Sequence, residues 1–142
     1  MSIEQENTFS QYQSLAEFRY QLRRFLHFSE QAARSVGLEP QQHHLLLTLK
    51  GLPQGRSATI TELAERLQIQ HHSTVELINR MVDRNLLERL RDESDQRKVI
   101  VHLTPYGEEV LRKLSMLHRI ELRSSGPELV HALQVLIDGE NK

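Results

Sequence analysis

The chain contains no cysteine among its 142 residues. This absence excludes disulfide bonds, thiolate metal sites, and catalysis or redox sensing by a thiol. No segment approaches the roughly 18 consecutive apolar residues of a membrane span. The N-terminal residues MSIEQENTFS also lack the basic stretch and apolar run of a secretion signal. We therefore expect a cytoplasmic protein that does not bind a membrane.

The chain also lacks an excess of charge of one sign. Its 18 Lys and Arg residues nearly balance 19 Asp and Glu residues, and the net charge is −1. A strongly positive domain is the usual mark of a nucleic-acid binder, so any such binding here must depend on local placement of cations. The sequence has neither a glycine-rich phosphate loop nor a Gly-x-Ser-x-Gly turn. We expect no enzyme activity and no cofactor.

What the sequence does have is helical periodicity. Apolar residues at three- and four-residue steps predict a long amphipathic helix over about 11–35, ended by Gly37. Pro40 opens a second helix, which stops in the segment 51–55. Its run Leu45-Leu46-Leu47 is too continuous for a surface element, so this helix is expected to be central.

Two Ser/Thr-x-x-Glu capping boxes follow, at 59–62 and 73–76. In such a box the first side chain bonds the third helical amide and the glutamate bonds back. They predict short helices near 61–67 and 73–85, joined by a turn that Ile69 pins. Helix, short turn and helix is the arrangement that many proteins use to read DNA.

The stretch RDESDQRKVIVHLT, residues 91–104, predicts the tip of a β-hairpin with strands at 86–90 and 98–103. Asn85 is expected to end the preceding helix in the left-handed conformation. Thr104 and Pro105 predict the start of another helix, with threonine as its cap. The segment 125–128 is expected to cap a separate last helix.

This order of elements resembles the multiple-antibiotic-resistance regulator (MarR) family of winged helix-turn-helix repressors. The most specific part is Asp92-x-x-Asp95-x-Arg97-x-x-x-Val101-x-Leu103-Thr104-x-x-Gly107, which follows the family's wing signature. TELAERLQI and NRMVDRNLLERL fit its helix-turn-helix. Asn85 replaces the family's usual glycine and Ser94 its common proline, and both suit the same turns.

The resemblance implies an all-α fold with a small β-hairpin wing. Residues 1–142 would form a single domain, in which helices at 11–35 and 105–138 dimerise and residues 40–103 form the winged helix-turn-helix lobe that binds DNA. Amphipathic termini with more apolar surface than a lone domain readily buries also favour a homodimer.

The resemblance further implies that the wing tip enters the minor groove with Arg97, which Asp95 would hold in a bidentate pair. On the recognition helix, a helical wheel places Ser73, Glu76, Leu77, Arg80 and Arg84 opposite the buried side. Arg80 would read guanine or phosphate, and Leu77 would touch a thymine methyl. The predicted DNA-contacting residues are Ser73, Thr74, Leu77, Arg80, Arg84, Asp95, Arg97 and Lys98. The competing interpretation is an ordinary solvated hairpin tip and helix face.

Eight histidines raise the question of a metal site. His43-His44 and His71-His72 are adjacent pairs, and neighbours on a helix point about 100° apart, so neither pair makes a two-ligand face. We predict no metal ligands.

The predicted function is a transcriptional repressor that binds a pseudo-palindromic operator in double-stranded DNA. A small phenolic or aromatic effector, of the kind to which family members respond, would release it by favouring a dimer geometry that does not fit DNA. The sequence pattern indicates no particular residues for the ligand site. Two alternatives stay open: a winged-helix module that binds protein instead of DNA, and a metal-responsive regulator.

Overall fold

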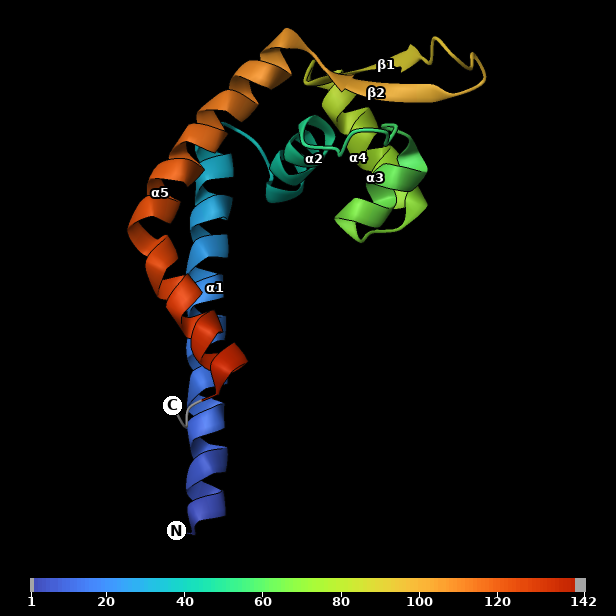
Figure 1. The fold of residues 1–142 in the computed structure, drawn as a ribbon. Coiled ribbons are helices and arrows are strands. Elements are labelled where there is room, and N and C mark those ends of the chain that lie inside the picture. The colour runs from blue at the N-terminus through green and yellow to red at the C-terminus, as the bar shows by residue number, and fades with distance from the viewer. Residues whose placement is uncertain (1, 140–142) are drawn as a thin grey trace. The chain divides into compact units, whose positions relative to one another are not determined.

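The structure is a computed structural model that describes residues 2–139. Its elements in chain order (Figure 1) are α1 (Ile3–Ser35), α2 (Pro40–Lys50), α3 (Ile60–Leu67), α4 (His71–Asp83), β1 (Leu87–Arg91), β2 (Val99–Leu103) and α5 (Pro105–Asp138). The predicted class, all-α with a β-hairpin wing, is confirmed. The chain divides into two compact units, and the prediction of a single domain stays a prediction.

One unit, which we call the reading head, consists of residues 33–115. Its core forms where α2 meets α3 and α4. The side chains that are almost inaccessible there are Leu45, Leu46, Leu63, Ile78, Met81, Leu86, Leu87 and Leu114. The prediction that α2 is central is confirmed. Leu47, however, is half exposed, because it lies on the side of α2 away from this core.

The helix-turn-helix begins as its first capping box predicts and continues differently at the second. Thr59 Oγ1 accepts a hydrogen bond from the Glu62 amide at 3.3 Å, and α3 ends at Gln68 in the left-handed region, with φ 57°. The tight turn at Gln68 lets α4 start at His71, so the prediction that Ser73 caps this helix is wrong. Inside the first turn, the Thr74 hydroxyl donates to the Gln70 carbonyl at 3.0 Å.

The hairpin is antiparallel, with Leu87 opposite Leu103 and Arg91 opposite Val99. Both strands begin one residue later than predicted. Asn85 has φ 60°, as expected for a residue that ends a helix in the left-handed conformation. The Val101 amide also donates to the Ala58 carbonyl at 3.2 Å, which attaches the wing to the loop before α3.

The start of α5 explains why threonine and glycine stand at 104 and 107. Thr104 Oγ1 accepts from the Gly107 amide at 3.0 Å and donates to the Asn85 carbonyl at 2.6 Å. A Cβ atom on Gly107 would lie 2.2 Å from the Leu86 carbonyl oxygen. The helix therefore packs against the chain before β1 at a distance that only glycine allows.

The prediction of a separate last helix capped at 125–128 is wrong. α5 runs without interruption to Asp138, with Pro127 inside it. The Ser125 hydroxyl donates to the Glu121 carbonyl at 3.0 Å, four residues back, which is a bond of a helix interior and not of a cap.

The other unit, which we call the helical unit, combines residues up to 32 with residues from 116 onward. Here α1 starts eight residues before the predicted position, because Ser2 and Gln5 form a reciprocal cap: Ser2 Oγ accepts from the Gln5 amide at 3.1 Å, and Gln5 Oε1 accepts from the Ser2 amide at 2.8 Å. The letters S-x-x-Q at 2–5 carried this signal.

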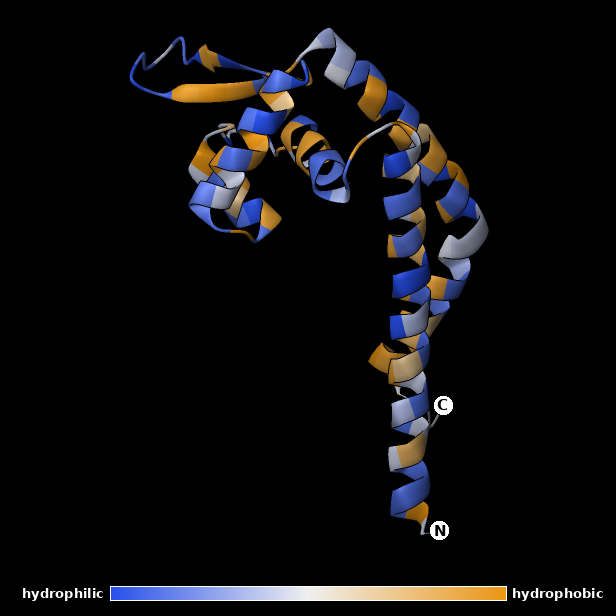
Figure 2. Ribbon diagram, turned by 180° about the vertical axis from the view of Figure 1, so that it is seen from behind, coloured by the Kyte–Doolittle hydropathy of each residue, from blue (hydrophilic) through white to orange (hydrophobic). Residues whose placement is uncertain are grey.

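Within the helical unit α5 runs beside α1 (Figures 1 and 2). Arg24 of α1 pairs with Glu128 of α5 at 3.2 Å. The His118 ring meets the edges of Phe25 and Phe28, and its Nε2 lies 2.8 Å from Ser29 Oγ. None of the described helices is both long and apolar enough to cross a membrane.

Candidate nucleic-acid interface

One face of α4 is open to solvent and the other is packed into the reading head. The buried side chains are Thr74, Leu77, Ile78 and Met81. The exposed ones are His71, His72, Glu76, Asn79, Arg80 and Asp83. Since the helix presents polar groups of both charge signs and no large apolar side chain, its outer face is suited to hydrogen-bonded recognition.

The placement of Leu77 on the outer face is wrong, and Thr74, which was predicted to contact DNA, is also buried. Thr74 is inaccessible and Leu77 is 4% exposed. Val75 and Val82, in contrast, are only half buried. Residues 74, 77, 78 and 81 form the true stripe, at the three- and four-residue steps of a buried helix face. Neither Thr74 nor Leu77 can reach a base without unpacking the core.

Of the other predicted contacts on this helix, Arg80 is exposed and Ser73 is half buried. Arg84 is engaged inside the reading head. Its guanidinium donates to the Gly37 carbonyl at 2.8 Å and to Gln42 Oε1 at 3.0 Å. Gln42 is itself buried and accepts from the Glu39 amide at 3.0 Å. Arg84 thus joins the end of α4 to the segment before α2, and we leave it out of the DNA contacts proposed below.

The structure brings together a pair that the sequence analysis missed. The Arg89 guanidinium on β1 donates a hydrogen bond to Asn79 Oδ1 on the outer face of α4. The two residues are separated by the end of α4 and the start of β1, so no helical or strand periodicity relates them. The only available signal was that β1 follows α4 after a very short turn, which places the strand beside the helix.

The wing tip holds Arg97 in a defined local geometry. Asp95 Oδ1 accepts from the Arg97 amide at 3.1 Å and from Arg97 Nε at 3.2 Å. The Arg97 side chain is 92% exposed and that of Asp95 is 31% exposed. The predicted bidentate pair is wrong, because one carboxylate oxygen meets Nε alone while also binding the backbone of the turn.

The Asp95 carboxylate is stabilised in its charged form. The backbone amide of Arg97 lowers the pKa of Asp95 most, followed by the Arg97 side chain, while the charge of Lys98 adds a smaller effect. The neighbouring Asp92 also orders the tip, since its Oδ1 accepts from the Ser94 amide at 3.1 Å. The cluster of charge at 92–98 is therefore a folded turn with one arginine projecting from it.

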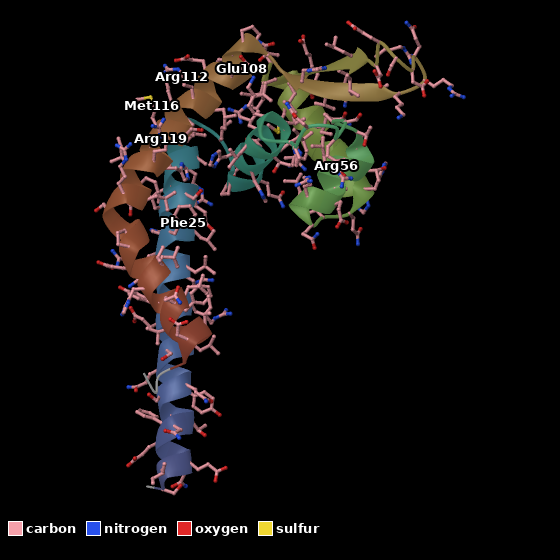
Figure 3. All side chains as sticks on the ribbon, in the orientation of Figure 1. Phe25, Arg56, Glu108, Arg112, Met116 and Arg119 are labelled. Atoms are coloured by element: carbon pink, nitrogen blue, oxygen red, sulfur yellow. The ribbon has the colours of Figure 1, made fainter. Side chains whose placement is uncertain are left out.

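Cations of the reading head differ in whether an acid neutralises them. Arg97 pairs with Asp95, Arg56 lies 3.6 Å from Glu62, and Lys50 lies 2.6 Å from Glu108. Arg56 and Glu108 are labelled in Figure 3. Arg91, by contrast, donates to the Gln96 carbonyl at 2.8 Å, which is a neutral partner. In the part of the chain that the structure describes, Arg80, Arg91 and Lys98 have no carboxylate within salt-bridge distance. No ion pair therefore offsets the charge of these three cations.

The histidines show no common site. His43 is buried in α2, whereas His71 and His72 are exposed at the start of α4. Within residues 2–139, no group of three or more His, Asp or Glu side chains is arranged to hold a metal ion.

Comparison with known proteins identifies relatives of the reading head. Residues 36–98 match the profile of the MarR family. A segment of 56 residues is 38% identical to the uncharacterized HTH-type transcriptional regulator YsmB of Bacillus subtilis. This match spans 39% of the chain and 38% of the relative's length.

Solved structures share the fold over a longer part of the chain. A crystal structure of a MarR family transcription regulator has a TM-score of 0.74 at 22% identity, covering 96% of this chain and 92% of that one. A mutant of MepR from S. aureus, bound to an oligodeoxyribonucleotide, has a TM-score of 0.65 at 20% identity, covering 75% and 77%.

Proposed function

Because residues 36–98 match the profile of the MarR family, we propose that this chain is a transcription regulator of that kind, which binds double-stranded DNA as a homodimer. The recognition helix α4 would enter the major groove and the β-hairpin the minor groove. This is the docking mode of winged helix-turn-helix proteins, in which base edges are read from a helix and shape is read by an arginine in a narrow groove.

The observation that carries the proposal is Arg97. Its side chain is almost fully exposed, yet Asp95 fixes both its backbone and its Nε. A long side chain that is partly ordered before binding loses less rotamer freedom when it enters a groove. A hairpin tip that needed only to be solvated would not require this arrangement.

The DNA contacts that we propose for each protomer are of two kinds, contacts made in the grooves and contacts made with phosphates. Ser73 and Arg80 would contact DNA from α4, and Arg97 from the wing. Arg80, Arg91 and Lys98, three cations with no acidic partner among the described residues, would neutralise phosphates. Three such cations in each protomer give six in a dimer, which predicts a slope of about −5 in a plot of log affinity against log salt concentration.

The homodimer is supported by apolar side chains that the helical unit leaves exposed. Figure 2 shows hydrophobic residues in orange along the ribbons of α1 and α5. Those at least 40% exposed are Ile3, Phe9, Tyr12, Leu15, Tyr20, Leu26, Met116, Ile120, Leu122, Val130, Leu133 and Ile137. Apolar surface repeated along two helices in this way is typical of an interface between protein chains. A symmetric dimer would present its two recognition helices roughly 34 Å apart to the half-sites of a pseudo-palindromic operator.

We further propose that the protein acts in the cytoplasm as a repressor released by a small aromatic or phenolic effector. Such an effector would act by population shift, binding more tightly to a dimer geometry that does not fit the operator. The difference between the effector's affinities for the two dimer geometries determines what fraction of the operator is left unbound.

Footprinting of the purified full-length protein on genomic DNA tests the central proposal. We expect protected sites with inverted symmetry, and binding that weakens steeply with salt. Protection without inverted symmetry would contradict binding as a dimer. An effector screen on a recovered site would then test ligand release.

The alternative function is a protein-binding winged helix, which the net charge of −1 favours. Retention on heparin separates the two functions, because a groove-binding protein should be retained in a salt-sensitive manner. Failure to bind heparin or any genomic fragment would favour protein recognition.

A further inference from the structure

Asn79 occupies the middle of the outer face of α4. It belongs to the exposed stripe His72, Glu76, Asn79 and Asp83, at steps of four, three and four residues. Positions spaced in this way lie above one another on a helix. Any surface that α4 presents to the major groove therefore includes the Asn79 amide.

The hydrogen bond from Arg89 fixes which way this amide points. A guanidinium has donors only, so the asparagine atom that faces it must be the oxygen. Oδ1 is therefore turned toward β1, and the Nδ2 amino group is turned away from the guanidinium. Without such a partner, an asparagine can present either its oxygen as an acceptor or its amino group as a donor to a ligand.

The amino group of Asn79 is still available for a ligand. Within residues 2–139, no acceptor is hydrogen-bonded to Nδ2, and Asn79 is exposed. Because the oxygen already has a donor, the side chain presents two N–H donors to whatever approaches α4. In the major groove, the matching acceptors are guanine O6 and N7, thymine O4 and adenine N7.

We propose that Asn79 reads one base of each half-site as a hydrogen-bond donor, and that Arg89 is the residue that positions it. The inference rests on the proposed DNA binding and adds a specificity residue that is not on the exposed face deduced from the sequence. In this proposal β1 has two roles: it forms part of the wing, and its Arg89 orients the base-reading side chain of Asn79 on α4.

The proposal predicts the kind of base at the contacted position. A cytosine on the contacted strand offers only an N4 donor there, so it should be disfavoured. A guanine or thymine should be retained. Adenine, which asparagine usually reads with oxygen and nitrogen together, should be selected less strongly, because the Asn79 oxygen is engaged by Arg89.

The test is a selection of binding sites from a random DNA library by the full-length protein. The variants are Asn79→Ala, Arg89→Ala and the double variant, with Arg91→Ala as the matched control. Arg91 lies on the same strand and also donates to a neutral partner, but that partner is the Gln96 carbonyl of the wing tip. Thermal melting would check that each variant folds.

We expect Asn79→Ala to lose base preference at one position of each half-site, with about 3- to 10-fold weaker binding to the best site. Arg89→Ala should lose preference at the same position, and the double variant should be no worse than Arg89→Ala. Arg91→Ala should weaken binding to all sequences alike and leave that preference intact, as loss of a phosphate contact does.

Several results would overturn the inference. Unchanged base preference in Asn79→Ala would overturn it. So would a loss of preference at different operator positions in Asn79→Ala and Arg89→Ala. A strong preference of the wild type for cytosine at the position that Asn79→Ala affects would also contradict it. If the wild-type protein selects no sequence at all, it is the proposed DNA binding that fails, and this outcome differs from the others because it appears before any substitution is made.

Discussion

Replacement of Arg97 by alanine should weaken operator binding while leaving the fold intact. The side chain is 92% exposed, and within residues 2–139 its hydrogen-bond partner is Asp95, so its removal should change stability by no more than about 0.5 kcal/mol. Loss of an arginine from a groove typically weakens binding by roughly tenfold to a hundredfold. Fluorescence anisotropy with a labelled operator measures this effect.

Two substitutions at Asp95 separate the effects of its two contacts, one with the Arg97 amide and one with Arg97 Nε. Asp95→Asn keeps an oxygen for the Arg97 amide but removes the charge that holds Nε, so we expect a loss of about two- to fivefold. Asp95→Ala removes both contacts and should disturb the turn itself. The structure thus predicts a larger effect for alanine than for asparagine at this position.

A double-mutant cycle separates orientation from turn formation. In an Arg97→Ala background, Asp95→Asn should have almost no further effect, because the contact to Nε no longer exists. Asp95→Ala should still weaken binding there, because the backbone amide at 97 loses its acceptor. Operator affinity of Arg97→Ala equal to that of the wild type would refute the reasoning, as would full additivity of Arg97→Ala and Asp95→Asn.

Three further predictions concern the turn, the fold and the dimer. An NMR titration should give Asp95 a pKa below its ordinary 3.8. The ion pair with Arg97 is therefore fully formed at neutral pH and is lost only as the pH falls through that lowered value. Arg97→Ala should raise the pKa of Asp95 only partly, because the backbone donor remains. Gly107→Ala should lower the free energy of unfolding by about 1–3 kcal/mol in urea denaturation, through collision with the Leu86 carbonyl. Val130→Glu, on the exposed apolar surface of α5, should shift sedimentation toward monomer, whereas Leu90→Glu on the reading head should not.

The sequence alone determined most of the elements and several of their ends. The box at Thr59, the left-handed Asn85 and the pair Thr104-Pro105 each act within a few residues, so local chemistry suffices to place a cap or a turn. The wing signature also indicated the resemblance to the MarR family and pointed to Arg97. At Ser73 and at Ser125 the sequence predicted a helix cap, but in the structure both residues lie inside a helix.

Only the tertiary structure decided which side chains face outward and what they touch. The buried stripe of α4 depends on how the helix packs against α2 and α3, so Leu77 lies in the core although a helical wheel places it outside. Arg84 bonds to Gly37 across 47 residues of sequence, and Arg89 bonds to Asn79 across a turn between a helix and a strand. Such pairs follow no helical or strand period, because they arise from contact between elements, and one of them now designates the residue that we expect to read the DNA.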